Sequence, residues 1–159
     1  MNLRKFVFFI VLICLLFYIF NSRILAQNSS VFLNIGGLFK GTIIIGYSYY
    51  FSPNLALRGS LEFLSVSSSE YSATASLLLI GVQYFFDYYK GFFLIGEFGL
   101  GTINIEGYSA AATLFKAIAG YRFLFDSFFI DPGIGFGAIS TSIGSFSQTG
   151  IFLEMGFLF

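Results

Sequence analysis

The chain has 159 residues, of which 57% are hydrophobic, 21% are aromatic and only 10% are charged, and its net charge at pH 7 is zero. A soluble domain carries about 25% charged residues, so this composition excludes an ordinary water-facing surface and indicates that lipid is part of the solvent. The balanced charge gives no basic face for nucleic acid, which we do not expect as a partner.

The amino-terminal segment has the pattern of a secretory signal peptide. Arg4 and Lys5 precede the apolar run 6–20, which is shorter than the roughly 20 residues of a transmembrane helix. Polar residues follow, and we predict a signal peptide at 1–26, cleaved after Ala26, and one mature domain at 27–159. An uncleaved anchor helix is the alternative. The single cysteine, Cys14, lies in this segment, so the mature chain would have neither a disulfide nor a reactive thiol.

Short apolar stretches run through the rest of the chain. Glycine, serine, asparagine or a charge interrupts each of them, so strands rather than helices would cross a membrane, and such strands must close into a barrel. The heptapeptides GYSYYFS (46–52), GVQYFFD (81–87) and GYRFLFD (120–126) recur about every 35–40 residues, and each ends a strand at a turn. We therefore predict an all-β fold, an eight-stranded antiparallel up-and-down transmembrane barrel, with strands near 31–39, 42–51, 55–65, 74–86, 92–103, 111–125, 128–140 and 148–159.

The predicted connections alternate in character. One set, at 52–54, 87–91 and 126–127, is short. The other set, at 67–73, 104–110 and 141–147, is rich in serine and threonine and mostly longer, while the first connection, near Lys40, is short. Short turns at one end and longer loops at the other are typical of outer-membrane barrels, with both termini at the short-turn end. Aromatic residues flank the short turns, and we interpret them as a girdle at the membrane interface.

Successive side chains of a strand point to opposite faces. If the aromatic residues beside the short turns face lipid, every mid-strand charge lies on the other face, toward the lumen. A charge that faces lipid at mid-depth would cost about 2–4 kcal/mol. This register predicts that glycines and bulky apolar side chains fill the interior around a salt-bridge network, so that no continuous water pore remains. In this network Arg122 lies opposite Asp131, Glu62 meets Lys116 across the lumen, and Glu154 turns toward Arg58 or Arg122. The predicted lumen charges are Arg58, Glu62, Glu97, Lys116, Arg122, Asp131 and Glu154.

Pro132 does not fit a regular strand, because it cannot donate to the ladder and a closed barrel has no edge. We expect either a bulge at this position or a turn that extends to 132, with the strand beginning at Gly133.

Catalytic and cofactor chemistry find little support in the sequence. It contains no histidine, which excludes Ser–His–Asp catalysis and removes the commonest metal ligand. Glu97 and Glu154 can approach each other across the barrel, but nearby cations favour salt bridges over acid–base work. The glycine run GIGFG at 133–137 does not lie between a strand and a helix, so it is not a dinucleotide motif. We expect no enzyme activity, no cofactor and no bound metal.

These features together resemble the small outer-membrane barrels typified by outer-membrane proteins A and X. The resemblance covers 27–159 and implies an integral protein of the bacterial outer membrane, with outer-membrane lipid as a partner and a monomeric state. Its most specific element is the alternating apolar ending with a terminal phenylalanine. That ending resembles the signal read by the barrel-assembly machinery, and the matching residues are Ile151, Leu153, Met155, Phe157 and Phe159.

The function that we predict is a non-enzymatic membrane barrel with a filled polar lumen and a structural or surface-interaction role. One alternative is a narrow channel or transporter for small apolar molecules, suggested by the apolar residues of the lumen. A second is a soluble ligand-binding barrel of the lipocalin type, which requires charges outside and apolar residues inside.

Overall fold

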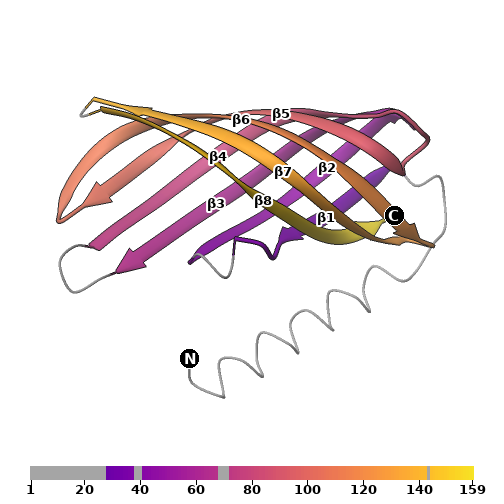
Figure 1. Cartoon of the computed structure of the whole chain (residues 1–159), viewed down its shortest axis with the longest axis horizontal. Helices are drawn as coiled ribbons and strands as arrows, with labels where there is room; N and C mark the ends of the chain where they lie inside the picture. Colours follow the sequence, from indigo (N-terminus) through magenta and orange to yellow (C-terminus); the bar gives the residue numbers. More distant parts are fainter. Residues whose placement is uncertain (1–27, 38–40, 68–71, 143) are drawn as a thin grey trace, which may run out of the picture.

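The computed structural model describes residues 28–37, 41–67, 72–142 and 144–159. Within these residues eight antiparallel strands follow one another around a closed barrel, which confirms the predicted fold class (Figure 1). The predicted signal peptide and its cleavage site lie outside the described residues. The strands are β1 (Ser29–Asn34), β2 (Thr42–Ser52), β3 (Leu55–Ser67), β4 (Ser72–Phe85), β5 (Gly91–Ile105), β6 (Tyr108–Phe125), β7 (Phe128–Thr141) and β8 (Gly144–Leu158). In the described part of the chain no helix has the length and hydropathy needed to cross a membrane.

The first strand is shorter than predicted. β1 ends at Asn34 rather than at residue 39, because the chain turns at Gly36 and Gly37. The backbone N–H of Gly37 donates to Asn34 Oδ1 at 3.0 Å, and the N–H of Thr42 donates to the Gly37 carbonyl at 2.9 Å. These local bonds replace the ladder that a longer β1 would need.

Two connections that we predicted as longer loops are shorter, because the strands beside them extend further. β5 continues to Ile105 and β6 begins at Tyr108, so only Glu106 and Gly107 connect them. Both turn residues have positive φ, 53° and 86°, as in the type I′ turns whose twist matches that of paired strands. At the other site β7 reaches Thr141 and β8 begins at Gly144. Polar strand ends can therefore continue the ladder beyond the apolar part of the barrel.

Pro132 lies within β7, and neither of the two predicted interruptions occurs. The pairing of β7 with β8 continues through Pro132 and Leu153. The pairing with β6 passes from Gly120–Gly133 to Phe123–Ile130, so both strands advance by the same number of residues and there is no bulge. Since proline lacks an N–H, the strand accepts it by omitting ladder bonds on the β6 side alone.

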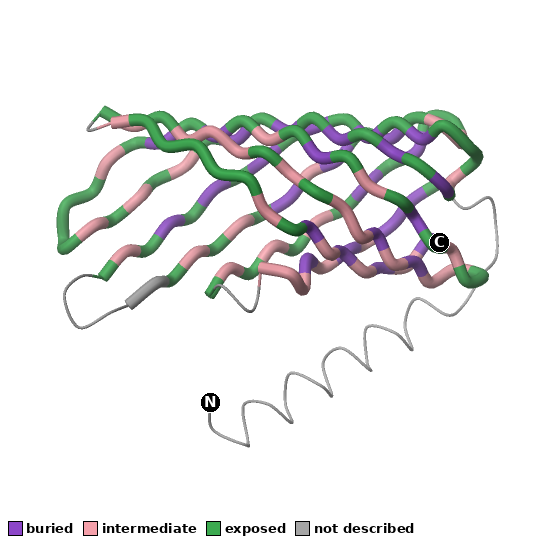
Figure 2. Tube along the Cα trace, in the orientation of Figure 1, coloured by how far each residue is buried: buried purple, intermediate pink, exposed green. Residues whose placement is uncertain are grey.

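Burial alternates along the strands, so that every second side chain points into the barrel (Figure 2). β4 shows this over most of its length, with a buried residue at every second position from Ala75 to Phe85. Glycines on the inner face make room for aromatic rings. A Cβ atom at Gly120 would lie 2.5 Å from Phe93 Cζ, and one at Gly156 would lie 2.5 Å from Phe129 Cζ. Small residues facing large ones are how a narrow barrel packs its interior.

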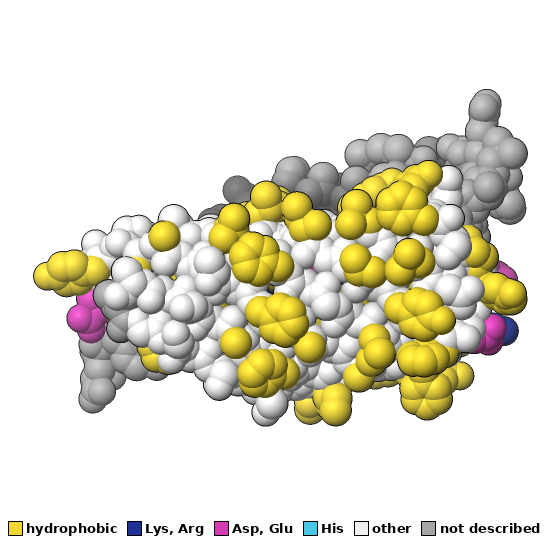
Figure 3. All heavy atoms as spheres, turned by 90° about the horizontal axis from the view of Figure 1, so that it is seen from above, with side chains coloured by type: hydrophobic (Ala, Val, Ile, Leu, Met, Phe, Trp, Pro, Cys, Tyr) yellow, Lys and Arg dark blue, Asp and Glu magenta, His cyan; other side chains and the backbone are white. Residues whose placement is uncertain are grey.

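The outer surface is apolar over the middle of the barrel. On the face in Figure 3, hydrophobic side chains are spread along the wall, and charged ones appear only at the two ends. Large aromatic and aliphatic side chains such as Phe51, Ile80, Phe98 and Ile134 are 53–70% exposed. Toward the end formed by the β5–β6 and β7–β8 turns, the outward positions change to exposed hydroxyl residues, which we call the Ser/Thr rim: Ser65, Ser76, Thr102, Thr113, Ser140 and Thr149.

Candidate functional site in the barrel lumen

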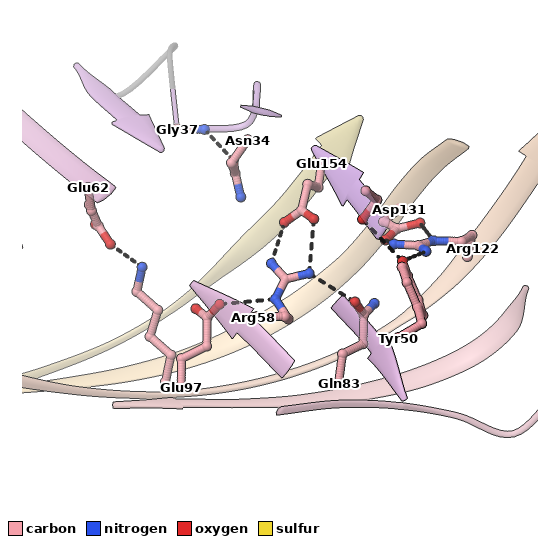
Figure 4. A network of polar contacts seen from close by, with 12 residues as sticks. Asn34, Gly37, Tyr50, Arg58, Glu62, Gln83, Glu97, Arg122, Asp131 and Glu154 are labelled. Atoms are coloured by element: carbon pink, nitrogen blue, oxygen red, sulfur yellow. Dashed lines mark hydrogen bonds and ion pairs between the residues drawn. The ribbon is translucent and has the colours of Figure 1, made fainter. Parts of the chain in front are cut away.

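The middle layer of the lumen is built around Arg58 of β3, which is 2% exposed. Its guanidinium binds Glu154 of β8 through two hydrogen bonds, from Nη1 to Oε1 at 3.1 Å and from Nη2 to Oε2 at 2.9 Å. Nε donates to Glu97 Oε1 of β5 at 3.1 Å, and Nη1 also donates to Gln83 Oε1 of β4 at 3.0 Å (Figure 4). The cation lies 4.0 Å above the centre of the Phe32 ring. One arginine thus connects five strands through its side-chain contacts.

A second layer lies nearer to the short-turn end, around Arg122 of β6. Nε and Nη2 donate to the two carboxylate oxygens of Asp131 on β7, at 2.8 and 2.6 Å, in a parallel bidentate pair. Nη1 donates to the Tyr50 hydroxyl at 2.6 Å. The guanidinium carbon lies 3.7 Å from the centre of the Phe129 ring and 4.6 Å from that of Phe85, so aromatic faces supply cation–π contacts where water is excluded.

The third layer, toward the Ser/Thr rim, is a single ion pair. Lys116 of β6 donates to Glu62 of β3, and the two side chains are 17% and 14% exposed. Glu97 is directly opposite Lys116 in the β5–β6 ladder but binds Arg58 in the middle layer. The longer lysine side chain therefore reaches across the lumen to β3 instead of pairing with its neighbour.

The structure brings the seven predicted charges to the inner face and distributes them over these three layers. Arg122 pairs with Asp131, and Lys116 pairs with Glu62. Of the two partners considered for Glu154, the structure places it on Arg58. Glu97 and Glu154 do approach each other, but with Arg58 between them as their common partner.

Sequence analysis missed the neutral members of the network. Gln83 and Tyr50 are both buried and hydrogen bond to the two arginines. The alternation of the sequence could have predicted both positions. Each residue stands between two exposed aromatic or aliphatic neighbours, so its own side chain points inward. Tyr50 lies between Tyr49 and Phe51, which we interpreted as girdle residues, and it was not assigned to the lumen.

Each carboxylate of the three layers contacts a cation, and the described residues contain no group of histidine, cysteine or acidic side chains suited to a metal ion. Three buried polar atoms have no hydrogen-bond partner within the described residues, namely Ser48 Oγ, Ser60 Oγ and Gln83 Nε2. The ion pairs and hydrogen bonds of the three layers join strands across the lumen.

Comparison with solved structures finds the same architecture in two bacterial proteins. The fold is that of small eight-stranded outer-membrane barrels. Neisserial surface protein A superposes with a TM-score of 0.62 over 82% of this chain and 93% of its own, at 12% identity. The N-terminal β-barrel domain of Pseudomonas aeruginosa OprF superposes with a TM-score of 0.55 over 84% of this chain and 98% of its own, at 19% identity.

Sequence comparison adds no family assignment, because no protein-family model matches the chain and no curated protein matches it significantly. At 12% and 19% identity the likeness is one of fold, so function must be argued from the inner and outer surfaces of the barrel.

Proposed function

We propose that the chain is an integral protein of the bacterial outer membrane, a non-enzymatic barrel whose polar lumen is filled and whose role is structural or in surface interaction. The observation that carries this proposal is the inverted polarity of the barrel. Arg58, Arg122, Asp131 and Glu154 are at most 2% exposed inside, whereas large apolar side chains cover the outside. Water would favour the reverse arrangement, as in a lipocalin, while lipid favours this one.

Membrane placement is further supported by the order of side chains along the outer wall. Aromatic residues, including Tyr49, Tyr84 and Tyr121, flank the short turns, aliphatic residues follow, and the Ser/Thr rim ends the band. Outer-membrane barrels have an apolar band bounded by interfacial residues and face the periplasm with their short turns. We infer that the described ends of the chain, at Asn28 and Phe159, face the periplasm, and that the segment 1–26 directs export. Outer-membrane lipid is then the principal partner of a monomeric barrel.

The proposed absence of enzyme activity rests on the state of the carboxylates. An acid–base pair needs a group free to exchange a proton with substrate at close range. Glu62, Glu97, Asp131 and Glu154 are each held by a lysine or an arginine instead. The sequence offers no histidine as a substitute.

The closed interior leads to a test in planar bilayers. We expect no discrete channel openings from the wild-type barrel, because the Arg58 and Arg122 layers and the rings of Phe85 and Phe129 fill the lumen. A variant with Tyr50, Phe85 and Phe129 all replaced by alanine should show small conductance steps, since it removes side chains that pack around Arg122. This variant also demonstrates that the protein inserts into the bilayer. Discrete openings of the wild type would instead support the narrow-channel alternative, for small molecules passing the partly exposed apolar positions near the rim, such as Ile103 and Ile139.

The alternating carboxyl-terminal residues are proposed to guide assembly. Ile151, Leu153, Met155 and Phe157 occupy outward positions of β8, alternating with the inward Phe152 and Glu154, and Phe159 follows directly after the strand. Phe159 also contacts Tyr47, with ring centres 6.4 Å apart. Before the barrel closes these alternating apolar side chains are open to an assembly factor, whereas in the folded barrel Phe159 exchanges two backbone hydrogen bonds with Ser29.

Replacement of Phe159 by alanine should therefore reduce assembly in cells more than stability. We expect a several-fold loss of folded protein in the outer-membrane fraction, with refolding into vesicles from urea unchanged. The control is Phe125→Ala, which removes an exposed aromatic residue at the same end of the barrel. Equal behaviour of the two variants in cells would refute an assembly role for Phe159.

A further inference from the structure

Among the described residues, the first half of β8 has a paired strand on one side only. β8 spans Gly144–Leu158, but its pairing with the short β1 stops at Asn34 and Glu154. Beyond that point the N–H groups of Ile35 and Gly36 both donate to the Leu153 carbonyl, at 2.8 and 3.1 Å, before the chain turns toward β2. Residues 144–152, which we call the β8 edge, therefore pair with β7 on one side (Figure 1). Among the described residues no strand pairs with them on the other side.

The hydrogen-bonding pattern identifies the groups that this edge leaves open. Ser29 and Phe159 exchange two backbone hydrogen bonds, at 3.1 and 2.8 Å, so every second residue of β8 directs its N–H and C=O toward β1. Leu153 continues this series by accepting from Ile35. The next members, which have no ladder partner among the described residues, are Ile151, Thr149, Ser147 and Ser145.

Burial changes at the same place. From Ile151 to Leu158 buried and more accessible residues alternate, but Ser145–Thr149 are all exposed. Phe146 faces inward by its register opposite Ile139, yet it is 61% exposed, and Ile151 is 78% exposed. Natural sheet edges are usually protected by charges, proline or a bulge, and the β8 edge has none of these.

The position of the β8 edge relative to the lipid layer determines which kind of molecule can hydrogen bond to it. Ile151 is opposite Ile134, which belongs to the apolar outer band, and Thr149 belongs to the Ser/Thr rim. Backbone groups at the depth of lipid must be hydrogen bonded, and an acyl chain offers neither donors nor acceptors. An extended polypeptide offers both in the required spacing, and adding a strand to an open edge is a common mode of peptide recognition.

We propose that the β8 edge is a docking site for an extended, uncharged segment of a partner polypeptide. The segment pairs antiparallel to β8, in the place that a longer β1 would occupy. Its residues opposite Ile151 and Thr149 face lipid and are apolar, and those opposite Gly150 and Phe152 face the lumen. This inference goes beyond the proposed function, because a filled membrane barrel does not require any such partner.

The experiment uses the complete barrel in phosphatidylcholine vesicles and a synthetic peptide as the probe. The peptide is an acetylated octamer of alternating valine and threonine, followed by two lysines that carry a fluorophore and remain at the membrane surface. We expect saturable binding by fluorescence anisotropy, and a cross-link from a photoreactive residue at position 149. A peptide of the same sequence with N-methylated alternate amides should partition into the lipid but not bind the barrel.

Two matched variants test the backbone groups themselves. Ser147→Pro combined with Thr149→Pro removes two N–H groups that face the open side and leaves the β7 ladder intact, so peptide affinity should fall at least tenfold. Ser147→Ala combined with Thr149→Val keeps both N–H groups and should bind within about twofold of wild type. Heat-modifiable gel mobility verifies that each variant is folded. Equal binding by the proline variant, or by the N-methylated peptide, would overturn the proposal and leave the barrel's own assignment unaffected.

Discussion

Replacing Arg58 by methionine is expected to lower the free energy of unfolding by about 3–5 kcal/mol, the usual effect of removing one partner from a buried ion pair. The substitution leaves Glu97 and Glu154 close together without their common cation, and Glu154 is fully buried. Urea unfolding of the barrel in lipid vesicles measures this loss.

Two further variants make the Arg58 result specific. Lys90→Met removes an exposed ion pair with Asp87, at 3.8 Å, and should cost no more than about 1 kcal/mol because solvent screens such pairs. Adding Glu97→Gln and Glu154→Gln to Arg58→Met should restore most of the stability, since no buried charge then lacks a partner in this layer. Equal losses for Arg58→Met and Lys90→Met would contradict the proposed importance of the middle layer.

An arginine in place of Ile80 should destabilise the folded barrel by about 2–4 kcal/mol in lipid, although Ile80 lies on the surface. Ile80 is 59% exposed on the outer face of β4, midway between the aromatic Tyr84 and Ser76 of the rim. In a water-soluble barrel the same substitution would change stability by only about 0.5 kcal/mol. Unfolding in vesicles therefore tests the membrane assignment at a single position.

Ser76→Arg is the matched control for Ile80→Arg, because it places the same charge on the same strand and face. At the edge of the apolar band its cost should be about 0–1 kcal/mol. If the two arginine variants were equally stable, the outer wall would not face a hydrocarbon layer.

The strand pattern could be predicted from the sequence because alternation with a period of two is a local property. Charges such as Glu97 and Lys116 stand between apolar neighbours. Once one face of each strand is assigned to lipid, the alternation assigns these charges to the lumen. The aromatic residues beside the short turns identified the lipid-facing positions.

The partners of the charges and the lengths of the strands depend on information that no local pattern contains. Arg58 contacts Glu97 and Glu154 because the stagger of the closed barrel brings β3, β5 and β8 to one level. The end of β1 depends on the Asn34 side chain and on two glycines that favour a turn over further pairing. The polar sequence around Glu106 read as a loop, although the I′ turn at 106–107 allows both strands to extend.

The middle layer around Arg58 and the second layer around Arg122 differ in the sequence separation of their ion-pair partners. Arg122 and Asp131 are 9 residues apart in one hairpin, whereas Arg58 and Glu154 are 96 residues apart. The Arg122–Asp131 pair can form as soon as β6 and β7 meet. The Arg58–Glu154 pair forms only when most of the chain has folded, so the entropic cost of closing the loop between its partners is larger. Until β1 joins β8, Arg58 can bind Glu97 of β5, but Glu154 would have to enter the membrane without its cation. Partly inserted states are therefore disfavoured, and closure of the barrel is the step that commits the chain to the bilayer.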